Sequence, residues 1–286
     1  MNRLALILPL LALAAMPVAR AEDPATNGSK LDFRISTNGW LRCEEFNAST
    51  NDVSTPFCFL ANDNNIDFVS LSDYERTDYG VGPEIDFVEF PKPGKLAPGE
   101  KRIESVPPLK WFRGLPGEYL DLKWVCGGGV SEHIVAVNAG PDGRTALPVV
   151  GRFDKGETVR LAFVVNGKDG PRLSFLVLNG SAEPLSAETL AGRVNVLGAV
   201  LEDGTVLDGI PLSDVVRFAD GVGAGKAAEA KLPLSEAFSR LSVPDSARKI
   251  TLVWTFGTFE SALPLWTGSD TATNASSADG AKEPAP

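Results

Sequence analysis

Apolar and polar residues alternate strictly in the clearest segments of this chain. In Val159–Val165 and in Ile250–Phe256, every second residue is large and apolar. This period of two predicts β-strands that each bury one face. Shorter apolar runs predict further strands at residues 40–46, 66–71, 85–90, 134–138, 173–178, 194–201 and 215–218.

Turn residues separate these predicted strands. Pairs that tolerate positive φ angles, as tight turns require, occur at Asn166-Gly167, Asp169-Gly170, Asn179-Gly180 and Asp203-Gly204. The stretch Val196–Val206, with Glu202–Thr205 at its centre, predicts a β-hairpin. Helix is predicted at Ser235–Leu241, with residues 224–231 as a second candidate and a single turn at residues 186–190. The predicted fold class is therefore all-β with one or two short helices.

The N-terminus has the features of an export signal. Arg3 precedes an apolar stretch, Leu4–Pro17, and Ala19-Arg20-Ala21 forms a cleavage site for removal after Ala21. The apolar stretch is too short for a membrane span. Cleavage removes two arginines and no acid, which changes the formal net charge from −10 to −12. We therefore expect a periplasmic or secreted, acidic protein with no membrane span, and its charge disfavours nucleic acid as a partner.

Composition fits an ordinary globular protein and limits its chemistry. The chain has 286 residues, of which 43% are hydrophobic and 22% charged, and only one is histidine. A single imidazole excludes zinc sites that need two or three histidines, and we expect no cofactor. Residues 22–30 read as a flexible lead-in, and Gly140–Gly143 as a boundary between domains at 31–140 and 144–266. Residues 267–286 lack apolar periodicity and predict a disordered tail.

Three cysteines, Cys43, Cys58 and Cys126, remain in the exported chain. Export places them in an oxidising compartment, so we expect one disulfide and one spare thiol. Cys126 ends a segment with alternating apolar residues, and Cys43 lies in an early predicted strand. A Cys43–Cys126 disulfide would join an early strand to a late one across a sandwich. Cys43–Cys58 is the alternative pairing.

Two short motifs resemble a known family. The segment Leu96–Glu100 reads L-A-P-G-E, and Pro116–Tyr119 reads P-G-E-Y just before a predicted strand. This pattern resembles bacterial immunoglobulin-like β-sandwich modules, in which such segments open two late strands. The resemblance implies two tandem immunoglobulin-like antiparallel sandwiches, with Asp154–Glu157 as a weaker echo of the first motif. Modules of this family serve as binding, scaffolding and inhibitor domains and as appendages of enzymes.

Several groups of residues contain side chains of the types found in catalytic or phosphate-binding sites. Ser131 and His133 are two residues apart, but no G-x-S-x-G nucleophile elbow is present. Glu84 and Asp86, with Asp73 nearby, could supply paired carboxylates, although their alternation also describes a solvated strand face. Residues 221–226 lack the first glycine of a phosphate-binding loop. The sequence therefore assigns no catalytic residue.

Asp63 and Asp67 are weak calcium candidates. They alternate with asparagines in a segment that lacks the glycine and glutamate of an EF-hand, so only a looser site built by loops remains. Four Asn-x-Ser triplets, at Asn27, Asn47, Asn179 and Asn274, would carry glycans only in a host that modifies them.

Aromatic residues suggest a binding surface. Trp111, Phe112 and Trp266 fall outside the strand faces assigned to cores, so they are candidates for docking a protein or stacking on a sugar, or for packing between domains. We expect an exported, non-catalytic binding, scaffolding or accessory protein, whose partner is another envelope or extracellular protein or a glycan. The alternatives are a carboxylate-based or metal-assisted hydrolase of a glycan or peptide, and an inhibitor of exported hydrolases.

Overall fold

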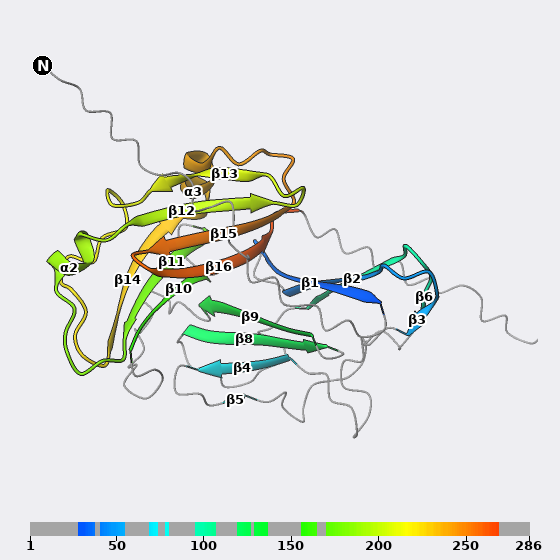
Figure 1. Cartoon of the computed structure of the whole chain (residues 1–286), viewed down its shortest axis with the longest axis horizontal. Helices are drawn as coiled ribbons and strands as arrows, with labels where there is room; N and C mark the ends of the chain where they lie inside the picture. Colours follow the sequence, from blue (N-terminus) through cyan, green and yellow to red (C-terminus); the bar gives the residue numbers. More distant parts are fainter. Residues whose placement is uncertain are drawn as a thin grey trace, which may run out of the picture.

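The protein consists mostly of β-strands (Figure 1). The computed structural model describes residues 28–37, 41–54, 69–73, 78–79, 95–106, 119–126, 129–136, 156–164 and 170–268. The first-half strands are β1 (Ser29–Ser36), β2 (Leu41–Asn47), β3 (Val53–Ser54), β4 (Val69–Asp73), β5 (Asp78–Tyr79), β6 (Lys95–Leu96), β7 (Lys101–Val106), β8 (Tyr119–Cys126) and β9 (Gly129–Ala136). The second-half elements are β10 (Glu157–Val164), β11 (Arg172–Asn179), α2 (Ala187–Ala191), β12 (Asn195–Leu201), β13 (Val206–Pro211), β14 (Lys226–Pro233), α3 (Leu234–Leu241), β15 (Lys249–Phe256) and β16 (Phe259–Trp266).

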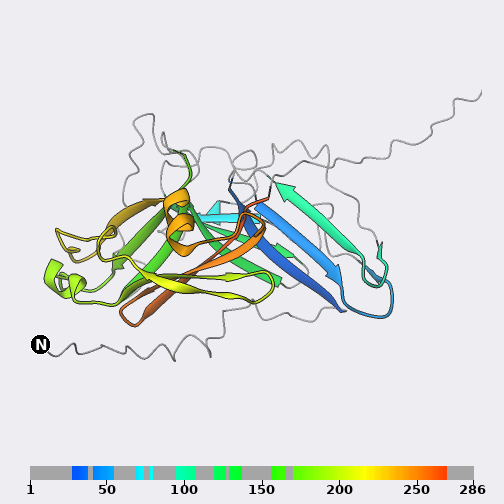
Figure 2. The ribbon, with the colours of Figure 1, turned by 90° about the horizontal axis from the view of Figure 1, so that it is seen from above.

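Two seven-stranded sheets contain nearly all of these strands. The first sheet has the order β13-β12-β15-β16-β1-β2-β7, and the second has the order β14-β11-β10-β9-β8-β4-β5. Each sheet therefore contains strands from both halves of the chain. Figure 2 shows the strands of the first half next to those of the second half. A separate ribbon pairs β3 with β6. Within the described ranges, no helix is long and apolar enough to cross a membrane.

Short parallel pairings join the two halves. In the first sheet, β1 meets β16 with Ile35 opposite Leu265 and Ser36 opposite Trp266. In the second sheet, β9 meets β10 with Val135 opposite Phe163 and Ala136 opposite Val164. The other pairings within the two sheets are antiparallel. These two joints thus differ from the other pairings of each sheet in strand direction.

The two halves have the same strand order. Strands β1, β2 and β7 of the first half are neighbours, as are β10, β11 and β14 of the second. The remaining strands form the series β5-β4-β8-β9 and β13-β12-β15-β16. In both halves, leaving aside the β3–β6 ribbon, the first, second and fifth strands lie in one sheet and the other four in the opposite sheet.

A buried asparagine occupies matching places in the two halves. Asn47 ends β2, is fully buried, and its Nδ2 donates to the carbonyl oxygen of Leu96 at 2.8 Å. Asn179 ends β11, is also fully buried, and its Nδ2 donates to the carbonyl oxygen of Val222 at 3.2 Å. In each case the serine two residues later donates its backbone N–H to the asparagine Oδ1. These two Asn-x-Ser triplets are structural turns with enclosed side chains.

These contacts identify the counterpart of the Leu96–Glu100 motif. Leu96 and Val222 are bonded by equivalent asparagines, and the glycines three residues later, Gly99 and Gly225, have φ angles of +77° and +63°. The matching segment of the second half is therefore Val222–Lys226. The expected echo at Asp154–Glu157 lies partly outside the described residues and stays a prediction; its last residue, Glu157, opens β10, the first strand of its half, whereas Leu96–Glu100 precedes the fifth.

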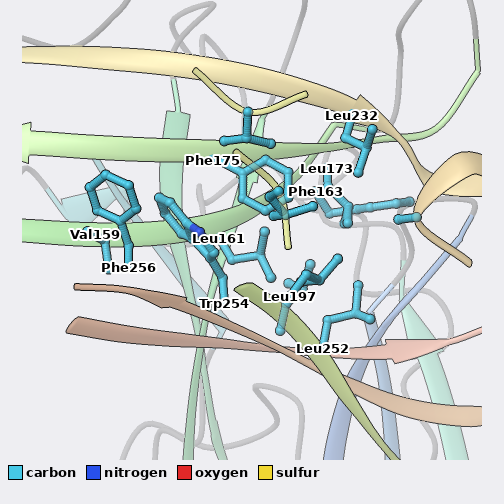
Figure 3. Packing of buried hydrophobic residues seen from close by; sticks show 14 of the residues in the cluster. Val159, Leu161, Phe163, Leu173, Phe175, Leu197, Leu232, Leu252, Trp254 and Phe256 are labelled. Atoms are coloured by element: carbon cyan, nitrogen blue, oxygen red, sulfur yellow. The ribbon is translucent and has the colours of Figure 1, made fainter. Parts of the chain in front are cut away.

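The main hydrophobic core lies between β10, β11 and β14 on one side and β12, β15 and β16 on the other (Figure 3). Trp254 is fully buried and packs edge-on against Phe175, with ring centroids 5.1 Å apart. Its indole Nε1 donates to Asn195 Oδ1 at 2.9 Å, and Asn195 Nδ2 donates to the carbonyl oxygen of Val216 at 3.0 Å. The polar end of the tryptophan is thus satisfied inside the core.

Most of the predicted elements in the second half are confirmed. The alternating segments form β10 and β15, the hairpin joins β12 and β13 with Gly204 at a φ angle of +85°, and α2 and α3 lie where short helices were expected. Residues 215–218 do not form a strand, since Val216 N–H instead donates to the carbonyl oxygen of Leu212 in a turn. The candidate helix at 224–231 is also wrong. Its residues form β14, which pairs with β11 along its whole length.

Candidate functional site

The outer surface of the first sheet is nearly free of charge over its second-half strands. In β15, Leu252, Trp254 and Phe256 point into the core, so Thr251, Val253 and Thr255 point outward, because side chains alternate along a strand. The register places three rows across the strands: Val206, Val200, Thr251 and Pro264; then Gly198, Val253 and Ala262; then Val196 and Thr255. We call these nine residues the apolar face.

Charged groups lie at the margins of the apolar face. Glu260 is opposite Thr255 in the register, and Asp208 lies where the pairing of edge strand β13 shifts. Val206 is 49% exposed, which is high for a large apolar residue. The solvent side of an antiparallel sheet normally carries polar side chains. An outer face of valine, threonine, alanine, proline and glycine is therefore a candidate contact surface.

A cluster of ion pairs adjoins the apolar face where the halves meet. Lys249 begins β15 and is only 8% exposed. Its Nζ lies 3.1 Å from Asp32 Oδ2, 3.0 Å from Glu44 Oε2 and 3.5 Å from Glu202 Oε1. Lys101 Nζ contacts the other oxygen of Glu44 at 2.8 Å. We call these five residues the charged cluster.

The charged cluster holds its groups in their ionised forms. Burial alone would raise the pKa of Glu44, but hydrogen bonds from Lys101 and Lys249 outweigh it, and the pKa lies below its ordinary value. Burial alone would lower the pKa of Lys249, but its bond to Glu44 and the attraction of Asp32 raise it. Asp32 and Glu44 belong to first-half strands and Lys249 to a second-half strand, so the cluster ties the halves together.

Trp266 lies between the apolar face and the strands of the first half. It is half-buried, and the guanidinium carbon of Arg42 lies 3.8 Å from its ring centroid. Gly268 also lies close, since a Cβ added there would be 2.5 Å from the ring. Arg42 belongs to the first half, so the ring packs against the joint. Its role in binding stays a prediction, and Trp111 and Phe112 lie outside the described residues.

Other residues singled out in the sequence have the following places. Cys43 is in β2 of the first sheet and Cys126 in β8 of the second, so a disulfide between them would link the two sheets. That pairing stays a prediction. Ser131 and His133 are in β9, and Asp73 ends β4. The remaining candidates, Cys58, Asp63, Asp67, Glu84, Asp86, Asn27 and Asn274, lie outside the described residues.

The described residues contain no group of three histidine, cysteine, aspartate or glutamate side chains that could hold a metal ion. The apolar face was not predicted from the sequence, in which the binding candidates were aromatic residues. A signal was present, however. The segment Ile250–Phe256 has threonine and valine at its alternate positions, where a solvated strand usually has charged residues.

Comparisons with known proteins add no family. No protein-family model and no curated protein matches the chain. Among solved structures, it is similar to red sea bream transglutaminase at 10% identity and a TM-score of 0.21, over 84% of this chain and 31% of that one. It is also similar to the BSP domain of a biofilm associated protein at 10% identity and a TM-score of 0.19, over 86% of this chain and 30% of that one. The chain thus spans less than a third of either structure, and likenesses this low carry no argument.

Proposed function

We propose that this is an exported, non-catalytic binding protein that docks a partner protein on the apolar face. The observation that carries the proposal is an uncharged outer surface across four adjacent strands of an acidic chain. The largest apolar patch on a typical monomeric protein covers about 300–600 Å² and is often functional. Fixed charges around it, such as the charged cluster, give the pattern of an apolar centre with a polar rim that is common in protein interfaces.

The scaffold proposed for this function is a pair of immunoglobulin-like sandwiches. The strand order supports it, because each half has its first, second and fifth strands in one sheet and its third, sixth and seventh in the other. This is the order of an immunoglobulin constant-type domain with the fourth strand moved to the opposite sheet. The signal-like N-terminus supports export to the periplasm or beyond.

A protein suits the apolar face better than a glycan. Sugars stack on exposed aromatic rings, whereas the nine residues of the face include no aromatic side chain. Trp266, at its border, has the Arg42 guanidinium over the ring, which blocks stacking on that side. A flat patch of valine and threonine instead matches a similarly flat protein surface.

The size of the face predicts a weak complex. Four strands spaced about 4.8 Å apart, with roughly five residues each at about 3.3 Å, give an area on the order of 320 Å². Both partners together would bury about 640 Å², which is below the roughly 1,200–2,000 Å² of stable complexes. We therefore expect transient binding, unless the charged cluster also takes part.

Site-specific photo-crosslinking in the natural host tests this function. A photoreactive amino acid replaces Ala262 on the apolar face or, as a control, Ser235 on the exposed side of α3. We expect one discrete crosslinked protein from position 262 and none from position 235. Adding Val253→Lys should abolish that crosslink, whereas Ser235→Lys should not. Equal crosslinking from both positions, or a product that survives Val253→Lys, would contradict the proposal.

A further inference from the structure

A groove lies beside α2, at the end of the molecule away from β1 and β2 (Figures 1 and 2). It has a volume of about 500 Å³ and runs between α2 and the loop of residues 213–219. Its lining includes the buried side chains of Leu190, Val216, Phe218 and Phe256. The volume falls within the range of about 300–1,000 Å³ that is common for small-ligand sites. We call this site the α2 groove.

Arg217 is the cation available to a ligand in the α2 groove. It is exposed, and its Nε donates to the carbonyl oxygen of Ser213 at 2.9 Å, which fixes the side chain over the loop. Asp214 forms an ion pair with Arg240 at 3.1 Å, which is the main cause that lowers its pKa, and the charge of Arg217 contributes to the same shift from a longer distance. Among the described residues, no carboxylate lies within ion-pair distance of Arg217. Its terminal nitrogens can therefore receive an incoming carboxylate in a bidentate geometry.

The other charged groups of the α2 groove have different roles. Arg193 is held by both oxygens of Glu157 and lies over the Phe256 ring, 5.3 Å from its centroid, so it is already neutralised. Glu188 is an exposed acid on α2 that also lines the groove. A carboxylate ligand must therefore bind at Arg217 and away from Glu188. These two charges fix the orientation of the ligand in the groove.

We propose that the α2 groove binds the C-terminal residue of a peptide whose last side chain is apolar. The carboxylate pairs with Arg217, and the side chain enters the space above the apolar lining. A C-terminal residue fits because it carries a carboxylate and a side chain on the same carbon. This matches Arg217, which has no ion-pair partner within the described part of the chain, next to an apolar hollow. This inference does not depend on the apolar face, which is formed by the outward side chains of the first sheet, whereas the groove is lined by α2, the loop of residues 213–219 and inward residues such as Phe256.

Trp254 provides an internal reporter. Asn195 lines the α2 groove and accepts the Trp254 indole N–H through Oδ1, so a bound ligand should shift the NMR signal of that N–H. The variant Trp254→Phe assigns the signal, because it removes this one indole. The shift reports occupancy of the groove separately from binding elsewhere on the surface.

Calorimetry and this NMR signal test the proposal with acetyl-Ala-Leu-Leu, its C-terminal amide, and decanoate. We expect the peptide acid to bind at least about tenfold more tightly than the amide and to shift the Trp254 signal. The variant Arg217→Gln should remove the difference between acid and amide. Glu188→Gln should strengthen binding of the acid, because it removes a like charge from the groove.

The matched control is Arg248→Gln. Arg248 is also exposed and also donates to a nearby backbone carbonyl, that of Asp245 at 3.2 Å, but it lies at the opposite end of β15 from Phe256. This variant should keep the preference for the acid. Equal affinity for acid and amide, an unchanged preference in Arg217→Gln, no binding of the acid at about 10 mM, or tighter binding of decanoate than of the peptide would each overturn the proposal.

Discussion

Replacing the buried asparagines at matching places in the two halves should destabilise the protein by similar amounts. The perturbation is Asn179→Ala. The Asn179 carboxamide donates to the carbonyl oxygens of Glu183, Val222 and Gly223 and accepts from the backbone N–H and hydroxyl of Ser181. Alanine removes all of these bonds and brings no water to a site that is fully buried.

The expected cost follows from the buried hydrogen bonds that are lost. A net hydrogen bond contributes about 0.5–1.5 kcal/mol, and a buried polar group left unsatisfied costs about 1–3 kcal/mol. The three carbonyl oxygens keep other partners, since Val222 O accepts from Leu185 N–H, Gly223 O from Lys226 N–H and Glu183 O from the Ser181 hydroxyl, whereas the Ser181 N–H loses its acceptor. We expect Asn179→Ala to lower the free energy of unfolding by about 3 kcal/mol. Asn47→Ala removes the corresponding bonds and should cost about the same.

Urea unfolding of the mature protein, followed by tryptophan fluorescence, measures both variants. Ser235→Ala on the exposed side of α3 is the control and should change stability by less than about 0.5 kcal/mol. Asn179→Asp adds a stricter test. At neutral pH it directs a carboxylate toward carbonyl oxygens, so it should destabilise the protein more than alanine does. The free energy of unfolding should recover partly in acid, as the carboxyl group protonates. A loss below about 1 kcal/mol for either alanine variant would refute the reasoning about the buried turns.

Three further predictions concern the joint, the loop before β14 and the core. Lys249→Met should destabilise the protein by about 1–3 kcal/mol at neutral pH. The pKa of Glu44 is lowered on folding, so its contribution is present above its ordinary value of 4.5 and is lost as the pH falls through the folded value. In this variant, the free energy of unfolding should therefore decrease less steeply than in the wild type as the pH is lowered into the acid range. Gly221→Ala should lower the free energy of unfolding by more than about 2 kcal/mol, because the φ angle is +67° and the added Cβ would be 2.4 Å from the Leu185 carbonyl oxygen. A thermal melt measures the loss, and a wild-type melting temperature would contradict it. Trp254→Phe should cost about 2–4 kcal/mol in urea unfolding, through lost volume and an unpaired Asn195 oxygen, and an unchanged midpoint would contradict it.

The amount that could be predicted from the sequence depended on how local each feature is. The strands β10 and β15 follow from period-two alternation, and the β12–β13 hairpin from Asp203-Gly204. Residues 224–231 are rich in alanine and lysine, which favour helix when considered alone. Pairing with β11 and burial of Leu232 in the core outweigh that preference, so the segment is a strand.

The candidate site depended on contacts that no local pattern encodes. The apolar face exists because strands from four places in the second half lie next to one another in one register. The charged cluster brings Asp32 and Glu44 to Lys249, more than 200 residues away in the chain. Trp266 alternates with the buried Leu263 and Leu265 of β16 and lies off the core face. Its contact with Arg42 could not be predicted, because it requires the parallel pairing of β1 with β16, the first and last described strands along the chain.

That joint constrains the order in which the protein can fold as its chain is delivered from the N-terminal side. Ile35 pairs with Leu265, so the two partners in this contact become available at different times. Until β16 has arrived, β1 has only β2 as a neighbour, and its other edge remains open to pairing with the wrong strand. Completion of the first sheet must therefore wait for the last described strand, and a chain interrupted before residue 266 would present an unprotected edge to chaperones and proteases.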